Sequence, residues 1–314
     1  MMRIENIFKK TNIDKKTSLR IAFPWKKLEL FLLRSPTSER LFILITFASL
    51  TLAISIFTFI FFNSLFNATD RLSLSFFFTQ SSALGTEGGI LYQLLGSLLL
   101  LTCTGILVTP LAFSIAIFDF FAKSKKTKVV LKSVLHTLNA TPSILYGILG
   151  FMFFTYTCHW GKSWLAGSII LALMILPTVT SSLVQNLATL PKEYIETAKS
   201  LGLKDDAIIV KILLPYSKGS FFTGILMGLA RAAGETAPIM FTATVFFGAT
   251  LPNGIKDNPV LALPYHIFNL IQDVVAKEAV SSAWATAFVL MSMILLLSLL
   301  LAPFRFKSHE EAQL

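Results

Sequence analysis

The sequence places two opposite charges four residues apart inside a long apolar stretch. Arg231 and Glu235 lie in GLARAAGETAPIMFTATVFFG, residues 228–248, within an apolar segment that covers residues 219–247. A single charge near the centre of a bilayer costs about 2.5 to 3.5 kcal/mol on insertion scales. A guanidinium can repay such a cost by making planar, bidentate hydrogen bonds with an oxyanion such as phosphate. These two residues are therefore the first candidates for a functional site.

Two interpretations of this pair are open. One stripe of the helix, within about 60° on a helical wheel, carries both charges together with Gly224 and Gly228. In the first interpretation, Arg231 and Glu235 form an i, i+4 ion pair that satisfies itself, and the glycines make ordinary helix contacts. In the second, the stripe faces a water-filled path, and Arg231 binds an anion there.

Glu235 and neighbouring neutral groups would make an anion path more selective. Phosphate near neutral pH keeps at least one proton, which the carboxylate of Glu235 can accept as a hydrogen bond, whereas sulfate carries none. Thr236 follows directly and is the third candidate residue of the substrate path. A hydroxyl in a membrane helix often bonds its own preceding carbonyl instead. Further possible neutral donors are Asn139, Thr141, Ser143 and Thr242.

The other chemistry-bearing residues do not form a recognisable site. Cys103 and Cys158 lack CxxC spacing, and the four histidines include no pair at metal-ligand spacing. Residues 161–163 read GKS, but a phosphate-cradling loop needs a glycine five residues earlier, where Tyr156 stands. We therefore expect no metal and no cofactor. We also expect that this chain is not itself an enzyme and that any ATP hydrolysis occurs in a partner.

The composition indicates that lipid surrounds most of the chain. Of 314 residues, 54% are hydrophobic and only 14% are charged, against about 25% charged in soluble domains. A membrane-spanning helix needs about 20 apolar residues. Six segments qualify, namely 41–62, 90–118, 133–154, 164–186, 219–247 and 284–303. We predict an all-α membrane protein with six transmembrane helices.

Prolines interrupt the second to fifth of these segments, as Pro110, Pro142, Pro177 and Pro238. A proline frees a backbone carbonyl that lipid cannot satisfy, so such helices need protein or water beside them. At Pro238 we expect a bend, because its nitrogen cannot donate to the carbonyl of Gly234. Helices two to five should therefore form a packed bundle, with the first helix peripheral.

The basic residues predict the orientation of the chain. Twenty-two of the 27 Lys and Arg residues fall on one proposed side, in residues 1–40, 123–132, 187–218 and 304–314. The positive-inside rule then puts both termini in the cytoplasm. This asymmetry also explains the net charge of +10 without nucleic acid as a partner. The predicted parts are a basic cytoplasmic segment (1–40), a first helix (41–62), a five-helix core (90–303) with a cytoplasmic loop (187–218), and a cytoplasmic tail (304–314).

The loop between the fourth and fifth spans carries the most distinctive pattern. Residues 190–215 read LPKEYIETAKSLGLKDDAIIVKILLP. Gly202 suits the left-handed position just after a helix end. Asp205 or Asp206 can cap a second helix, which we expect to stop before Pro215. We therefore predict two short helices that meet at Gly202.

This loop resembles the EAA loop of ABC importer permeases. In that family Glu-Ala-Ala is followed by three residues, Gly, nine residues and Ile-x-Leu-Pro. The sequence matches this pattern from Glu196 to residue 215 and departs from it at Thr197. The resemblance implies the ABC importer permease (MetI-like) fold. It also implies that the loop forms coupling helices seated in a cleft of a separate ATP-hydrolysing subunit, with Glu196, Ala198 and Gly202 in the coupling role.

A second resemblance narrows the substrate. Four stretches resemble phosphate transport permeases of the PstA type: GETAPIMFTA at 234–243, ATPSILYG at 140–147, LPYHIFNLI at 263–271 and AWATAFVL at 283–290. The companion PstC type shares the EAA loop and the Arg-x-x-Gly-Glu arrangement, but the GETAPIMFTA run favours PstA. The resemblance implies a subunit of an ATP-driven phosphate importer in which Arg231 and Glu235 line the translocation path.

The same resemblance implies a set of partners and a location. The partners would be a PstC-like second permease, two copies of a PstB-like ATP-binding subunit and a PstS-like extracytoplasmic phosphate-binding protein. The location would be the bacterial inner (plasma) membrane. The loop 248–283 would be external, and its LPYHIFNLIQDVV stretch is either a helix under the binding protein or a structural cap.

Three alternatives stay open beside this hypothesis. The chain is a PstC-type subunit, or a permease for another oxyanion such as sulfate or molybdate in the same fold. From a different class, it is an ion-coupled secondary transporter or channel, for which no inverted repeat or set of paired intramembrane charges is evident.

Overall fold

The computed structural model describes residues 37–82, 85, 87–272 and 277–300. The expectations for residues 1–36 and for the tail beyond residue 300 lie outside the described residues. A small antiparallel hairpin pairs β1 (Ser81–Ser82) with β2 (Glu87–Gly88). The helical elements, of which η2 and η3 are π-helical, are α2 (Thr37–Ala68), α3 (Leu74–Phe78), α4 (Leu91–Phe121), α5 (Lys125–Ala140), α6 (Ser143–Gly150), η2 (Phe151–Thr157), α7 (Trp164–Ala188), α8 (Lys192–Ser200), α9 (Asp205–Ile208), η3 (Ile209–Leu213), α10 (Leu214–Ala233), α11 (Ala237–Thr242), α12 (Leu263–Gln272) and α13 (Lys277–Leu299).

Five of the described helices are long and apolar enough to cross a membrane. They are Leu41–Ala68, Leu91–Phe121, Trp164–Ala188, Asp205–Ala233 and Lys277–Leu299. The helices Lys125–Ala140 and Ser143–Thr157 make a sixth candidate if this bent pair is counted as one span. The prediction of an all-α membrane protein is confirmed.

The first long helix, α2, is apolar on every side. Its side chains from Leu44 to Phe59 are all exposed. A helix without a polar face suits lipid rather than water. The chain divides into two compact units after Phe59, and the following description concerns the unit that begins at Ile60.

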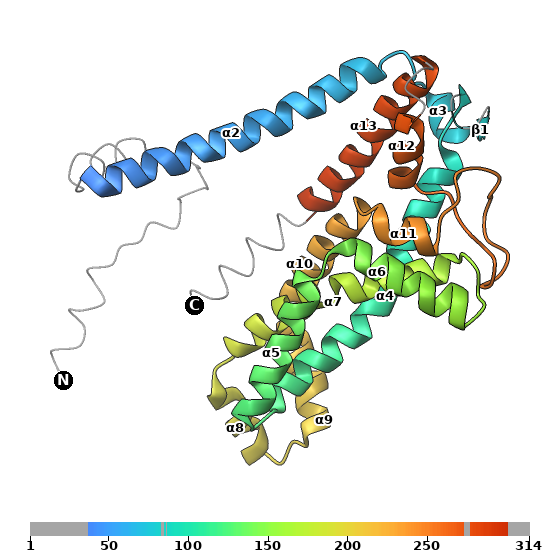
Figure 1. Ribbon diagram of the computed structural model, residues 1–314. Helices are drawn as coiled ribbons and strands as arrows, with labels where there is room; N and C mark the ends of the chain where they lie inside the picture. The colour runs from blue at the N-terminus through green and yellow to red at the C-terminus, as the bar shows by residue number, and fades with distance from the viewer. Residues whose placement is uncertain (1–36, 83–84, 86, 273–276, 301–314) are drawn as a thin grey trace. The chain divides into compact units, whose positions relative to one another are not determined.

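Helix α7 forms the centre of this unit. It packs against α4 and α10 most extensively, and also against α5, α6 and α11. Its largest fully buried side chains include Leu171, Ile175, Val179 and Leu183, which recur four residues apart. In lipid such a helix is held by close packing more than by hydrophobic transfer. Figure 1 places α8 and α9 at one end of the unit and α3, β1 and α12 at the other.

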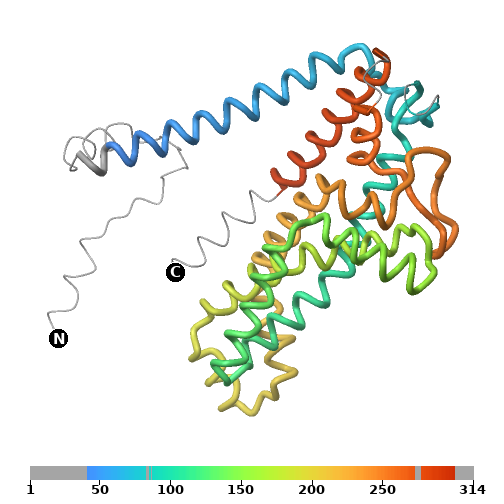
Figure 2. Tube along the Cα trace, in the orientation of Figure 1, coloured from blue at the N-terminus to red at the C-terminus, as the bar shows by residue number. Residues whose placement is uncertain are grey.

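The third predicted span, 133–154, is not one continuous helix. Helix α5 ends at Ala140, and α6 begins at Ser143 after a bend of 92°. Thr141 has an extended ψ of 126° because a residue before proline disfavours the helical conformation. Figure 2 shows the chain turning at this point. The break leaves the last turn of α5 beside the end of α10.

The fifth predicted span, 219–247, is broken as well. Helix α10 ends at Ala233, and α11 starts at Ala237. The helix is thus interrupted just before Pro238, where a bend was expected. Pro238 lies in the first turn of α11, where its missing N–H would have no helical acceptor.

Two expectations for the cytoplasmic loop were wrong. The second loop helix does not stop before Pro215, because α9, η3 and α10 follow one another without a gap and Pro215 sits in the first turn of α10. The π-helical turn at η3 changes the hydrogen-bond pattern just before the proline, so the helix passes it. Neither Asp205 nor Asp206 is the cap, since Lys204 precedes the helix and makes no side-chain capping bond.

Lys162 and its neighbours hold the C-terminal end of α11 in place. The Lys162 ammonium donates to the carbonyls of Met240 and Thr244, each at 2.9 Å. The Ser163 N–H donates to the carbonyl of Thr242 at 2.8 Å. These bonds satisfy carbonyls at the C-terminal end of α11 that the short helix leaves open. The expected helix in the LPYHIFNLI stretch is present as α12.

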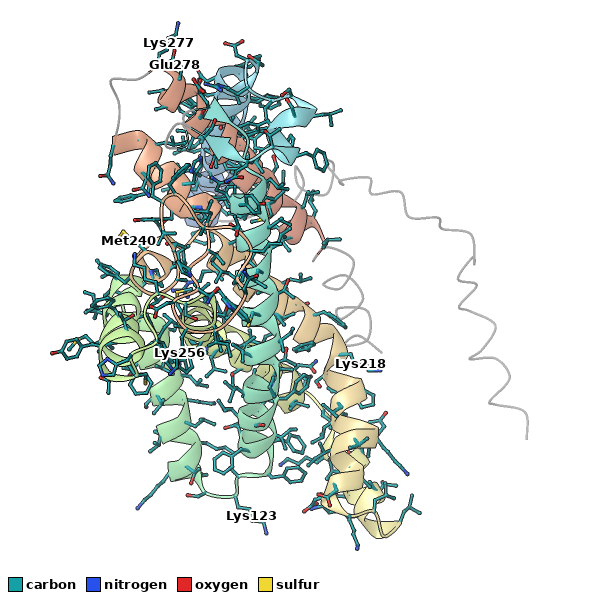
Figure 3. The ribbon with its side chains drawn as sticks, turned by 90° about the vertical axis from the view of Figure 1, so that its right-hand side faces the viewer. Lys123, Lys218, Met240, Lys256, Lys277 and Glu278 are labelled. Carbon is teal, nitrogen blue, oxygen red and sulfur yellow. The ribbon has the colours of Figure 1, made fainter. Side chains whose placement is uncertain are left out.

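Figure 3 shows the two ends of the unit from the side. Lys123, in the turn between α4 and α5, lies at one end, and Lys277 and Glu278, at the start of α13, lie at the other. Lys218, near the start of α10, lies toward the Lys123 end. The basic segments 123–132 and 187–218 therefore share one end, as the topology prediction requires.

Candidate functional site

The site lies where α10 ends, opposite the last turn of α5. Arg231 occupies the last turn of α10, and Glu235 follows in the break before α11. The guanidinium Nη1 donates to Asn139 Oδ1 at 3.0 Å. Its Nε lies 3.8 Å from Glu235 Oε1. The structure thus brings together three residues from two broken spans.

The Arg231–Glu235 pair is loose and partly open. The side chains are 38% and 19% exposed, respectively, and 3.8 Å is too long for a strong charge-assisted hydrogen bond. Of the five N–H donors that a guanidinium carries, the described hydrogen bonds engage one, on Asn139. The guanidinium therefore keeps donors for a further acceptor.

The glycines of the predicted stripe pack against α7, whereas Arg231 bonds to α5. A Cβ on Gly224 would lie 2.8 Å from the Ser182 Cβ, and one on Gly228 would lie 3.2 Å from the Ile175 Cβ. Both glycines are buried. They allow α10 to approach α7 closely, as the first interpretation proposed for them, while the longer Arg231 side chain reaches Asn139 on α5.

The predicted neutral groups differ in what they can contact. Thr242 is fully buried and bonds the carbonyl of Pro238, and Thr141 bonds the carbonyl of Thr137, each at 2.8 Å. These are the local bonds expected of hydroxyls in membrane helices. Thr236 is partly buried beside Glu235 and directly precedes α11. Asn139 alone among these donors contacts Arg231 through a described hydrogen bond.

The coupling loop has the two-helix geometry expected from its sequence. Gly202 has φ +80° and follows α8. Its N–H donates to the carbonyl of Lys199 at 2.9 Å, and the Leu203 N–H donates to the carbonyl of Ala198 at 3.0 Å. This pair of bonds is the Schellman motif, which satisfies the last carbonyls of a helix. An ion pair between Lys199 and Asp205 at 3.4 Å crosses the turn but is well exposed, so it contributes little.

The loop presents one face inward and another outward. Ala198 is 5% exposed and belongs to the main hydrophobic core. Glu196 is exposed on the same helix. Tyr194 on this helix and Leu201 just after it are also exposed. The hairpin therefore offers a mixed acidic and apolar surface at the basic end of the unit.

Two features of the site escaped the sequence analysis. Asn139 was considered only as a substrate donor, yet its amide oxygen accepts from Arg231. Lys162 was considered only within an incomplete phosphate-loop pattern, yet it caps α11, the helix that follows Glu235. The proline breaks predicted bends, but the direction of each bend, and hence these contacts, depends on tertiary packing.

Comparison with known proteins places the chain in a family. Residues 108–305 match the family described as binding-protein-dependent transport system inner membrane component. A phosphate transport system permease protein PstA of Xylella fastidiosa is 31% identical over 216 residues, which is 68% of this chain and 73% of that protein. The PstA 2 protein of Mycobacterium bovis is 30% identical over 216 residues, covering 68% of this chain and 70% of that protein.

Two further likenesses have lower sequence identity. A probable ABC transporter permease protein, YqgI, of Bacillus subtilis is 27% identical over 245 residues, covering 74% of this chain and 83% of that protein. The MetNI methionine ABC transporter in inward-facing conformations matches the structure with a TM-score of 0.47 at 13% identity, covering 71% of this chain and 95% of that chain.

The protein is a multi-pass inner-membrane permease of the ABC importer class. It belongs to the family of binding-protein-dependent transport system inner membrane components. A permease of this family works with a second permease, an ATPase and a binding protein, and it is not itself an enzyme. The predicted class and fold type are thereby confirmed.

Proposed function

We propose that this chain is the PstA-type permease subunit of an ATP-driven inorganic phosphate importer. The observation that carries the proposal is the Arg231 guanidinium at the open end of α10, 3.0 Å from Asn139 and loosely paired with Glu235. Similarity to PstA proteins over about two thirds of the chain supports phosphate as the substrate.

At this site Arg231 would bind the phosphate oxygens, and Glu235 would distinguish a protonated oxyanion from an unprotonated one. The guanidinium fork matches two oxygens of a tetrahedral oxyanion. Asn139 holds the guanidinium in place through its amide oxygen. Glu235 repels an unprotonated oxyanion but accepts a hydrogen bond from the P–OH group of phosphate, which sulfate lacks. Thr236 would contribute a neutral hydroxyl beside them.

Coupling would run through the loop at the basic end of the unit. In the proposal, the hairpin of α8 and α9 docks into a cleft of a PstB-like ATPase, with Glu196 on the contact surface. Buried Ala198 and the left-handed Gly202 keep the hairpin on the core. A PstC-like permease would complete the path, and a PstS-like protein would deliver phosphate at the opposite end.

Reconstitution tests the proposed substrate. The complex of this chain with its second permease, ATPase and binding protein is placed in proteoliposomes with ATP on the ATPase side. We expect ATP-dependent uptake of labelled phosphate, with little uptake of sulfate or molybdate. Uptake of sulfate or molybdate in preference to phosphate would refute the proposed substrate, and phosphate uptake without ATP would refute the proposed class.

The orientation has its own test. A reporter that is active only in the cytoplasm should work when fused within residues 123–128 or after Leu314. It should fail at residue 255, in the loop where the Gly254 carbonyl accepts a hydrogen bond from the Trp164 indole N–H. Activity at residue 255 would contradict cytoplasmic termini combined with six spans.

A further inference from the structure

A groove with several polar side chains adjoins Asn139, the residue that accepts from Arg231. It has a volume of about 570 Å³ and is lined by residues of α5, α7 and α10. Its polar side chains all carry hydrogen-bond donors, and no acidic residue is among those that line it. These donor side chains include Lys132, His136, Asn139, Thr178, Ser181 and Gln185.

These donors form two rows. On α5, Lys132, His136 and Asn139 are spaced by four and three residues, which places them on one helix face. On α7 the neutral donors at 178, 181 and 185 repeat the same kind of spacing. The α5 residues are exposed in the single chain, so the groove is open to a solute. A surface of donors without a carboxylate favours an anion over a cation.

The groove is continuous with the proposed phosphate site. Asn139 lines the groove and also accepts the hydrogen bond from Arg231. Lys132 precedes Asn139 by seven residues, or about 10 Å along the helix. On α10, Gly224 lines the groove seven residues before Arg231. The groove therefore extends from the Arg231 level toward the end of the unit that holds Lys123 (Figure 3).

An anion that leaves Arg231 needs new partners at once. Moving a phosphate away from a guanidinium without replacement bonds leaves a desolvated charge unpaired, which is costly. Water, hydroxyls and a second cation along the groove reduce that cost. Among the residues that line the groove, Lys132 supplies the ammonium group.

We propose that this groove is a second oxyanion site on the exit side of Arg231. There, Lys132 and His136 receive phosphate after Arg231 releases it. The inference rests on the proposed phosphate transport and extends it by naming a site that holds the substrate before it enters the cytoplasm. Such a site also binds phosphate arriving from the cytoplasm, so cytoplasmic phosphate inhibits transport by occupying it.

A matched pair of variants tests the exit site. Lys132→Gln and Lys126→Gln each remove one positive charge from exposed positions on α5, but Lys126 does not line the groove. Proteoliposomes that contain the assembled complex are loaded with ATP and increasing unlabelled phosphate, and the initial uptake of labelled phosphate is measured. For Lys132→Gln we expect the half-inhibitory internal phosphate concentration to rise about tenfold, because one charge-assisted hydrogen bond to phosphate is lost.

Other readouts separate the site from general damage. Lys132→Gln should also lower kcat while leaving the half-saturating external concentration unchanged. Lys132→Arg keeps the charge and should retain inhibition within about threefold of wild type. His136→Gln should shift inhibition in the same direction as Lys132→Gln, and Lys126→Gln should match wild type. Recovery of each complex by size-exclusion chromatography controls for assembly.

Equal inhibition of Lys132→Gln and Lys126→Gln by internal phosphate would overturn the exit site, even though wild-type uptake works. Absence of ATP-driven phosphate uptake by wild type would instead refute the proposed function. A lipid headgroup offers the same phosphate oxygens as the free anion. If the Lys132→Gln effect follows the phosphatidylglycerol content of the vesicles and ignores internal phosphate, Lys132 binds lipid and the proposal fails.

Discussion

The hydroxyl of Tyr146 donates a hydrogen bond to the backbone carbonyl of Leu138 at 2.8 Å. In an uninterrupted helix this carbonyl would accept the N–H of residue 142, which is a proline and has none. Tyr146 is only 7% exposed. Its hydroxyl therefore replaces the N–H donor that the proline lacks. The bonded carbonyl belongs to the residue just before Asn139, which accepts the hydrogen bond from Arg231.

Removing this hydroxyl should loosen the Arg231 site. Tyr146→Phe leaves the Leu138 carbonyl without its partner and should cost about 1 kcal/mol of stability. We expect the last turn of α5 to fray, so that Asn139 holds Arg231 less well and the half-saturating phosphate concentration for transport rises about threefold to tenfold. Thermal unfolding and uptake kinetics of the assembled complex measure both effects. Tyr156→Phe is the control, because Tyr156 lies in the same bent pair and is 78% exposed; equal kinetics in the two variants would contradict a role for the Tyr146 bond.

His266 should make the stability of the unit depend on pH. It lies on α12, is 3% exposed, and its Nδ1 is 3.4 Å from Gln93 Nε2. Burial lowers the pKa of His266 from 6.5 to about 4. The unfolded chain then binds a proton that the folded chain does not, so stability is lost as the pH falls from about 6.5 to about 4. The loss amounts to roughly 3 kcal/mol over that whole window.

A substitution separates this effect from general acid sensitivity. His266→Gln removes the titrating group, so the loss of thermal stability between neutral and mildly acidic pH should become smaller. His159→Asn serves as the control, because His159 is exposed and has a positive φ of 53°, which asparagine tolerates. Identical pH profiles for wild type and His266→Gln would show that another group carries the acid sensitivity.

The turn at Gly202 should be needed for coupling through its backbone alone. Nothing lies within 4 Å of the position that a Cβ would take, so a side chain meets no neighbour. The φ of +80° is costly for valine and less so for asparagine. Gly202→Val should therefore abolish phosphate-stimulated ATP hydrolysis and uptake while the chain still inserts, and Gly202→Asn should retain much of both.

Glu196→Lys reverses an exposed charge on α8 and should also uncouple ATP hydrolysis from uptake. Normal stimulated hydrolysis in Glu196→Lys and Gly202→Val would mean that the loop is only structural.

Much of the coupling loop was predictable because its determinants are local. A glycine at a left-handed position defines the end of α8 without reference to the rest of the chain. Pro215 misled the prediction, since a π-helical turn ahead of it carries the helix through. Ile208, just before that turn, and Leu213, at its end, are both almost fully buried in the core, so the turn is part of the tertiary packing.

The Arg231 site was only partly predictable. The intramembrane charges and the proline breaks are visible in the sequence, and so is the approach of Gly224 and Gly228 to a neighbouring helix. Helical-wheel geometry placed both glycines on one stripe with Arg231, but a wheel gives the Cβ directions and not the reach of a long side chain. The sequence did not show which helix Arg231 contacts, because that contact depends on the 92° bend between α5 and α6.

The structure also sharpens the choice between an ion pair and an anion path. Arg231 is hydrogen-bonded to Asn139 at 3.0 Å, whereas its separation from Glu235 is 3.8 Å. A self-sufficient pair would not need Asn139, and exchange of the two charges would preserve it. An anion site depends on the position of the guanidinium, which the exchange moves into the break between α10 and α11.

We therefore expect that Arg231→Glu combined with Glu235→Arg does not restore uptake lost in either single variant. Arg231→Lys should lower kcat/KM for phosphate at least about tenfold, because a lysine keeps the charge but loses the fork that bonds Asn139 and phosphate together. Glu235→Gln keeps the size and removes the negative charge that strengthens the hydrogen bond from the P–OH group and repels an unprotonated oxyanion, so phosphate uptake should fall and discrimination against sulfate should weaken. Uptake is normalised to the assembled complex, because an unpaired charge can also destabilise the bundle. Full uptake by the exchanged double variant would place Arg231 in a structural ion pair and remove it from the path.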